Sequence, residues 1–203
     1  RQDVAIPIRK AIFNIPNILT MFRIVLIPLV LIELTESTRA SCFLACVFFS
    51  LASITDFFDG YLARKTGTVS VLGKFLDPLA DKLIVLCVLI QLVAMNRVPA
   101  WMFIVILSRE LIISGLRSIA STEGIVISAE YLGQKKTAFQ LVGMLMLLVH
   151  YTYEIDFFIV RAPINFHLIG MYTLSISLFL SVASGIEYFY LFSKKVFGKS
   201  VQS

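Results

Sequence analysis

The sequence predicts an all-α integral membrane protein with six transmembrane helices and a polar cavity at the cytoplasmic ends of the second, third and fourth helices. Three observations lead to this prediction. Of the 203 residues, 58% are hydrophobic and 15% are charged, whereas soluble domains average about 45–50% and about 25%. The mean hydropathy is +0.88. The apolar residues gather in six long runs, and most charged residues fall between these runs or at their ends.

We interpret residues 1–203 as one membrane domain that opens with an interfacial segment, residues 1–14. This segment is mixed and amphipathic and has no small-residue cleavage site, so we expect no cleaved signal peptide. Asn14-Ile15-Pro16-Asn17 marks the start of the first helix, since Pro is tolerated in a first helical turn. At about 20 residues per span, the expected transmembrane helices cover residues 18–34, 40–63, 78–96, 99–120, 135–153 and 166–191.

The six predicted spans differ in polarity along their length. The last two carry no formal charge over residues 137–153 and 162–186, whereas the second, third and fourth are polar at one end. These ends carry Asp56, Asp59 and Arg64, then Asp77, Asp81 and Lys82, then Arg109, Glu110 and Arg117. Because charged side chains facing lipid are costly, we expect the three polar ends to meet.

The distribution of Lys and Arg predicts the orientation, because cytoplasmic loops are enriched in them. With the N-terminus inside, the inner side receives Arg1, Arg9, Lys10, Arg64, Lys65, Lys74, Lys82, Lys135, Lys136, Lys194, Lys195 and Lys199. The outer side receives only Arg39, Arg97 and Arg161. We therefore expect both termini and the polar helix ends on the cytoplasmic side. Cations placed between hydrophobic spans indicate topology and contacts with membrane lipids, so we expect no nucleic-acid partner.

Four aspartates lie where the second span ends and the third begins. Asp56 and Asp59 are three positions apart, and Asp77 and Asp81 are four apart, so each pair shares one face of its helix. Facing lipid, four carboxylates would cost on the order of 10–14 kcal/mol, so we expect them to face the protein interior. An all-oxygen donor set without His or Cys favours hard cations. The sequence thus predicts a site for two Mg²⁺ or Mn²⁺ ions.

Other interpretations of the acids stay open on the residues alone. They could form a proton or cation pathway, as in a cation transporter, or a structural ion-pair network with Arg64, Lys74 and Lys82. Gly60 and Gly73 favour a ligand site, because glycine lets a ligand approach the backbone, and Arg64 can donate two hydrogen bonds to a phosphate. Acids at helix ends also argue against a transporter site, which is expected at the midplane. Phosphoryl chemistry is the favoured interpretation.

The pattern Asp-x-x-Asp-Gly-x-x-Ala-Arg, eight residues, Gly-x-x-x-Asp-x-x-x-Asp runs from Asp56 to Asp81. It resembles the signature of the CDP-alcohol phosphatidyltransferase family. The resemblance implies a transferase of phospholipid biosynthesis, commonly a homodimer, that moves the phosphatidyl group of a CDP-linked lipid to an alcohol and releases CMP. It implies metal ligands at Asp56, Asp59, Asp77 and Asp81, with Asp81 also the general base. It implies nucleotide or phosphate contacts at Gly60, Arg64 and Ser70, with Gly73 leaving room for them.

Cations at the inner helix ends bear on the acceptor alcohol. Arg109 and Arg117 are about two turns apart and share a face, and Lys135 and Lys136 open the fifth span. This set predicts an anionic acceptor. Alternatively, Lys135 and Lys136 anchor their helix at the lipid headgroups and Arg109 pairs with its neighbours.

Residues 14–23, 108–117 and 132–137 look like the corresponding stretches of bacterial phosphatidylglycerophosphate synthases, which act in the cytoplasmic membrane. There the donor is CDP-diacylglycerol and the acceptor is glycerol 3-phosphate. We expect Arg109, Arg117 and Lys135 to bind the acceptor phosphate. Arg23 either joins them or extends to the headgroups. Asn17 and Thr20 are expected near the CDP-diacylglycerol, with helix capping as the alternative. Cardiolipin synthases and phosphatidylinositol-phosphate synthases remain alternatives within the family.

Overall fold

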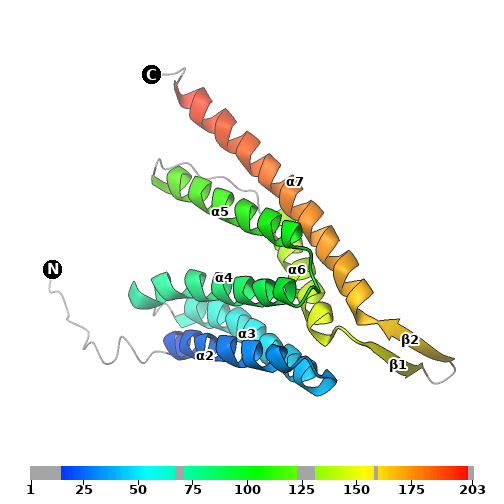
Figure 1. Cartoon of the computed structure of the whole chain (residues 1–203). Coiled ribbons are helices and arrows are strands. Elements are labelled where there is room, and N and C mark those ends of the chain that lie inside the picture. Colours follow the sequence, from blue (N-terminus) through cyan, green and yellow to red (C-terminus); the bar gives the residue numbers. More distant parts are fainter. Residues whose placement is uncertain (1–14, 67–70, 123–130, 158–159, 201–203) are drawn as a thin grey trace. The chain divides into compact units, whose positions relative to one another are not determined.

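The computed structural model describes residues 15–66, 71–122, 131–157 and 160–200, with side chains described for residues 18–55, 82–122, 135–154 and 163–195. Six helices account for most of these residues (Figure 1). They are α2 (Ile15–Glu36), α3 (Arg39–Thr66), α4 (Val71–Ala94), α5 (Ala100–Thr122), α6 (Tyr131–Val149) and α7 (Phe166–Ser200). The chain divides into two compact units, Arg1–Gln91 and Leu92–Ser203, which are described separately.

The helical part of the prediction is confirmed, since each of the six predicted spans corresponds to one helix. Within the described residues, two helical stretches are long and apolar enough to cross a membrane, Ile18–Glu36 and Phe166–Lys195. The apolar stretches found within the described side chains of α3 and α4, Arg39–Thr55 and Lys82–Ala94, are shorter. A topology of six membrane spans therefore stays a prediction, as does the interfacial role of residues 1–14, which lie outside the described residues.

A β-hairpin between α6 and α7 was not predicted. Strand β1 (Thr152–Phe157) pairs antiparallel with β2 (Val160–Asn165), so that Thr152 lies opposite Asn165. The fifth helix accordingly ends at Val149 rather than at residue 153. His150 follows with φ 60°, the left-handed conformation that commonly terminates helices. The expectation of a purely helical chain has to be corrected at this point.

In the first unit, α2 packs along α3 through one stripe of each helix. The buried positions on α2 are Thr20, Arg23, Leu26, Ile27, Val30 and Leu34, and those on α3 are Ser41, Cys42, Ala45, Phe49 and Ala52. Both sets recur every three or four residues, as expected for one helix face. The start of α3 is fixed by Thr38 and Ser41, since the backbone N–H of each donates to the hydroxyl of the other, a reciprocal helix cap.

In the second unit, α6 and α7 lie side by side (Figure 1) and approach closely at two glycines. A Cβ on Gly143 would lie 2.9 Å from the backbone nitrogen of Leu174. A Cβ on Gly170 would lie 2.9 Å from the backbone nitrogen of Leu147. Small residues that let backbones approach are typical of helix pairs in membranes. Helices α6 and α7 carry four of the polar residues described below.

A buried arginine holds the end of α6 where the chain turns into the hairpin. Arg97 is 5% exposed, and its Nη1 donates hydrogen bonds to the carbonyl oxygens of Leu147 and Leu148. These carbonyls belong to the last turn of α6, which has no further helical N–H groups to bind. The positive charge also complements the negative end of the helix dipole. Arg97 therefore stabilises the junction between α6 and β1.

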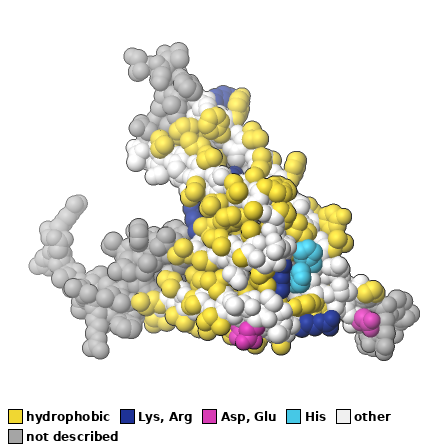
Figure 2. Space-filling view, in the orientation of Figure 1, with side chains coloured by type: hydrophobic (Ala, Val, Ile, Leu, Met, Phe, Trp, Pro, Cys, Tyr) yellow, Lys and Arg dark blue, Asp and Glu magenta, His cyan; other side chains and the backbone are white. Residues whose placement is uncertain are grey.

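Many of the exposed side chains of α7 are large and apolar, whereas several of its buried side chains are serines. Phe179 is 74% exposed and Ile186 67% exposed, whereas Ser177, Ser181 and Ser184 are at most 3% exposed. Figure 2 shows hydrophobic side chains over much of the visible surface of the described residues. A helix with an apolar outer face and hydroxyls turned inward is typical of a protein embedded in lipid.

Candidate active site

The signature aspartates lie on helices, as their spacing predicts. Asp56 and Asp59 belong to α3, and Asp77 and Asp81 belong to α4. Each pair therefore occupies one face of its helix. The side chains of these four residues lie outside the described residues, so their proposed metal ligation stays a prediction. Among the described side chains, no three or more of His, Cys, Asp and Glu are grouped to hold a metal ion.

The residues expected at the nucleotide also fall mainly outside the described side chains. Gly60 and Arg64 lie on α3 and Gly73 on α4, but nothing is described beyond their helical backbone. Ser70 lies outside the described residues. Their binding roles stay predictions.

The two polar residues of α2 are buried. Thr20 is 0% exposed and Arg23 is 1% exposed, and both lie on the α2 face whose other members pack in the core. Asn17 lies in the first turns of α2, with its side chain outside the described residues. Burial of Arg23 inside the protein argues against its extension along the lipid surface to the headgroups. Polar groups buried in a membrane helix mark functional positions by default.

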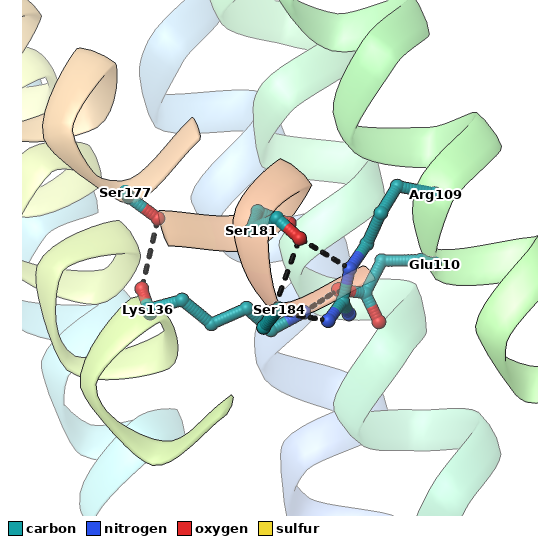
Figure 3. Close-up of polar contacts among 6 residues, drawn as sticks. All are labelled: Arg109, Glu110, Lys136, Ser177, Ser181 and Ser184. Carbon is teal, nitrogen blue, oxygen red and sulfur yellow. Dashed lines mark hydrogen bonds and ion pairs between the residues drawn. The ribbon is translucent and has the colours of Figure 1, made fainter. Parts of the chain in front are cut away.

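A polar cluster in the second unit joins three helices (Figure 3). We call it the Glu110 cluster; it comprises Arg109 and Glu110 from α5, Lys136 from α6, and Ser177, Ser181 and Ser184 from α7. All three serines lie on the buried stripe of α7 at spacings of four and three residues. The cluster is thus built into the faces through which these helices meet.

The guanidinium of Arg109 is held from two sides. Its Nε donates to the carbonyl oxygen of Ser181 over 2.9 Å, and its Nη2 donates to the hydroxyl of Ser184 over 2.7 Å. Its Nη1 donates to Oε1 of Glu110 over 3.1 Å. The hydroxyl of Ser184 in turn donates to the Ser181 carbonyl oxygen over 3.0 Å. Gly185 leaves space for this side chain, since a Cβ there would lie 3.4 Å from Cγ of Arg109.

Lys136 completes the ionic part of the cluster. Its ammonium group forms an ion pair with Oε1 of Glu110, the same oxygen that binds Arg109. The lysine side chain is 8% exposed. Its backbone carbonyl accepts a hydrogen bond of 2.8 Å from the hydroxyl of Ser177. One carboxylate oxygen therefore binds two cations from different helices in a largely buried environment, where charge-assisted hydrogen bonds are strong.

The other predicted acceptor cations lie differently. Arg117 and Lys135 are exposed, and the charge of Arg117 acts electrostatically on both Arg109 and Lys136. The expected pairing of Arg109 with its neighbours is also observed, through Glu110. Arg109 is therefore ion-paired and partly buried, and the charge of Arg117 lies within electrostatic reach of it.

Lys136 is one of the cations that predict an anionic acceptor, but the sequence did not assign it to the acceptor phosphate. Glu110 and the three serines were not identified as site residues. A signal for Lys136 exists, because it continues the buried stripe of α6 through Gln140, Met144 and Leu147 at intervals of three or four residues. Lys135, one position earlier, falls off that stripe and is exposed. The serines on α7 also recur every three or four residues. This spacing places them on one face of the helix, opposite its most apolar face.

Comparison with known proteins agrees with the signature. The sequence model of the family described as CDP-alcohol phosphatidyltransferase matches residues 13–183. A relative from Bacillus subtilis (strain 168) is named CDP-diacylglycerol–glycerol-3-phosphate 3-phosphatidyltransferase. It is 40% identical over 189 residues, covering 87% of this chain and 94% of the relative.

Proteins with the same name in Rickettsia bellii and Haemophilus influenzae are 36% and 35% identical. These matches cover 87% and 85% of this chain, and 93% and 95% of the relatives. The family model and the similarity to these relatives thus both extend over most of the sequence. The chain belongs to the CDP-alcohol phosphatidyltransferase family.

Proposed function

We propose that this protein transfers the phosphatidyl group of CDP-diacylglycerol to sn-glycerol 3-phosphate, giving phosphatidylglycerophosphate and CMP. The complete signature from Asp56 to Asp81 is the observation that supports this type of reaction. The names of relatives that are 35–40% identical over most of the chain support this donor and acceptor. The two cations of the Glu110 cluster, one buried and one partly buried, are suited to an acceptor that carries a phosphate.

The proposed metal site fits the chemistry of its donors. Four carboxylates on two consecutive helices supply only oxygen ligands, which suits two Mg²⁺ or Mn²⁺ ions. Asp56, Asp59, Asp77 and Asp81 would hold them. Such ions neutralise charge on the pyrophosphate of the donor and on the CMP that leaves.

The chain's own groups would perform the remaining steps. Asp81 accepts the proton of the attacking hydroxyl of glycerol 3-phosphate, as a general base must. That oxygen forms a bond to the phosphorus bearing the diacylglycerol, and the bond from this phosphorus to the CMP oxygen breaks. Arg64 binds the donor phosphates, since its guanidinium can donate two parallel hydrogen bonds. Gly60, Gly73 and Ser70 shape the nucleotide site, with Asn17 and Thr20 beside it.

The acceptor phosphate would be bound by Arg109, Arg117 and Lys135, with Arg23 as a further cation. The acceptor is an anion, and electrostatic attraction by several cations raises its local concentration at the site. The buried Lys136 is paired with Glu110, and together with Arg109 these groups keep one net positive charge.

We propose that the protein acts in a bacterial cytoplasmic membrane as a multi-pass homodimer, with both termini and the active site on the cytoplasmic side. The excess of Lys and Arg in the segments assigned to that side supports this orientation. Membrane lipids would contact the apolar outer faces of the helices, such as the exposed Phe179 and Ile186 of α7.

Release of CMP from CDP-diacylglycerol tests the proposed function. Purified protein in detergent micelles should release CMP only when glycerol 3-phosphate and either Mg²⁺ or Mn²⁺ are present, and EDTA should stop the release. Release with phosphatidylglycerol or inositol phosphate as the acceptor would instead identify another transferase of the family. Cation flux across liposomes without any CDP-lipid would identify a transporter and contradict the proposal.

A further inference from the structure

Glu110 occupies an unusual position for a carboxylate in a site that is proposed to bind an anion. Its Oε1 accepts hydrogen bonds from both Arg109 and Lys136, and Arg109 is one of the cations proposed to bind the acceptor phosphate. A carboxylate there repels the substrate, so attraction of the acceptor cannot be its role. Its contacts instead determine where the two cations lie.

The hydrogen bonds of Arg109 leave part of its guanidinium available. A guanidinium has five N–H donors, and three of them bind Ser181, Ser184 and Glu110. Within the described part of the chain, two N–H groups of Arg109 therefore have no hydrogen-bond acceptor. Two donors of one planar group are what a phosphate needs for bidentate binding. The three existing bonds fix the plane in which these two donors lie.

The charges of the cluster also require a carboxylate. Arg109 and Lys136 are like charges in a largely buried region, where repulsion is stronger than in water. Because both bind the same oxygen of Glu110, the carboxylate holds them close together despite this repulsion. The three groups together retain one net positive charge for an anionic ligand.

We propose that Glu110 is a positioning residue for the acceptor, and that Ser184 assists it from α7. Glu110 holds the guanidinium of Arg109 and the ammonium of Lys136 at a fixed spacing, and the Ser184 hydroxyl fixes the guanidinium plane. The remaining N–H groups of Arg109 are then presented to the phosphate in one orientation, without an ordering cost on binding. This inference rests on the proposed function, because it takes glycerol 3-phosphate as the acceptor.

The test is steady-state kinetics of Glu110→Gln, with the concentrations of the two substrates varied separately. The amide keeps the size of the side chain but loses the charge that binds two cations. Because hydrogen bonds to charged groups contribute substantially to binding, we expect the KM for glycerol 3-phosphate to rise about tenfold or more. The KM for CDP-diacylglycerol should stay within about twofold, since its binding uses other residues. A loss confined to one substrate is the signature of positioning rather than of general unfolding.

Ser184 supplies a second, independent variant. Ser184→Ala removes the acceptor of Arg109 Nη2 and should also raise the KM for glycerol 3-phosphate selectively, by roughly three- to tenfold. Ser184→Thr restores a hydroxyl and should recover most of the affinity. Ser175→Ala and Glu187→Gln are matched controls, because both residues are exposed on α7, and both variants should behave like the wild type. If Glu110→Gln fails to fold, the KM values of Ser184→Ala and Ser184→Thr for glycerol 3-phosphate still test the positioning role.

The outcomes separate this inference from the function on which it rests. A wild-type protein that releases no CMP in response to glycerol 3-phosphate contradicts the proposed function. An active wild type whose Glu110→Gln variant keeps its KM for glycerol 3-phosphate within twofold overturns only the positioning role. An equal rise in the KM of both substrates overturns it too, because the effect is then not specific to the acceptor.

Discussion

Nε of Arg109 donates a 2.9 Å hydrogen bond to the carbonyl oxygen of Ser181, a residue 72 positions later in the chain. The bond fixes a cation of α5 to the backbone of α7. The C-terminal helix, whose outer face is strongly apolar, is therefore part of the polar site. If Arg109 binds the acceptor phosphate as proposed, helix α7 supports that binding through its contacts with Arg109 and Lys136 rather than through charges of its own.

The proposed general base gives the first prediction. Asp81→Asn keeps the size of the side chain but cannot accept the proton of the attacking hydroxyl, and general bases typically contribute 10²- to 10⁴-fold to the rate. We expect CMP release to fall at least about 100-fold. Glu154→Gln, at an exposed position of β1, is the control and should keep full activity. An Asp81→Asn variant with more than about a tenth of wild-type turnover would remove this residue from the mechanism.

The close approach of α6 and α7 gives a prediction about stability. Alanine at Gly143 or Gly170 places a Cβ 2.9 Å from a backbone nitrogen of the facing helix, so the helices must move apart. Overpacking of this kind costs about 1–3 kcal/mol, and the thermal unfolding temperature should fall. Gly115→Ala is the control, because a Cβ there meets nothing within 4 Å. Equal unfolding temperatures for all three variants would show that close packing at the glycines contributes little.

Much of the helical structure could be predicted from the sequence, but the end of α6 could not. The apolar runs are long enough to locate all six helices, and the spacing of the aspartates agrees with α3 and α4. The hairpin was concealed because Tyr153, Ile155 and Phe157 extend the apolar character of α6. Their alternation with Thr152, Glu154 and Asp156 is nevertheless a strand pattern of period two.

The Glu110 cluster could be predicted only in part. Arg109 stands out because charge is rare inside an apolar helix. Its partners Ser181 and Ser184 do not, since serines occur in many membrane helices and no local pattern connects residues more than 70 positions apart. The choice between Lys135 and Lys136 depends on which face of α6 meets α7, and this is a property of the folded chain.

Arg97 gives a prediction for the hairpin end of α6. Arg97→Gln loses charge-assisted hydrogen bonds to the carbonyls of Leu147 and Leu148, and bonds of this type contribute about 1.5–3 kcal/mol. We expect a lower unfolding temperature with an unchanged KM for glycerol 3-phosphate. The exposed Arg39→Gln serves as a control. A change in KM without a change in stability would mean that Arg97 acts on the substrate.

His150, which follows the last residue of α6, is expected to make the stability of the folded protein depend on pH. Burial, the charge of Arg97 and the neighbouring His167 lower the pKa of His150 from 6.5 to about 4. In the folded protein His150 is therefore neutral, whereas the unfolded chain binds a proton below about pH 6.5. The stability from neutral His150 is present above that pH and declines as the pH falls towards 4.

Thermal unfolding between pH 7 and pH 4 measures this effect. His150→Asn is the suitable comparison, because Asn does not titrate in this range and tolerates the positive φ of this position. The variant should lose less stability on acidification than the wild type. Parallel pH profiles for the two proteins would exclude His150 as a source of the decline.

The central claim is that the protein transfers the phosphatidyl group of CDP-diacylglycerol to glycerol 3-phosphate. The ratio of the two products tests this claim most directly. Glycerol 3-phosphate labelled with ³²P is incubated with CDP-diacylglycerol, Mg²⁺ and the protein, and the label in extracted lipid is compared with the CMP released. We expect equal amounts of labelled lipid and CMP, and neither product without the acceptor. CMP released without label in the lipid would indicate hydrolysis or another acceptor and would contradict the account.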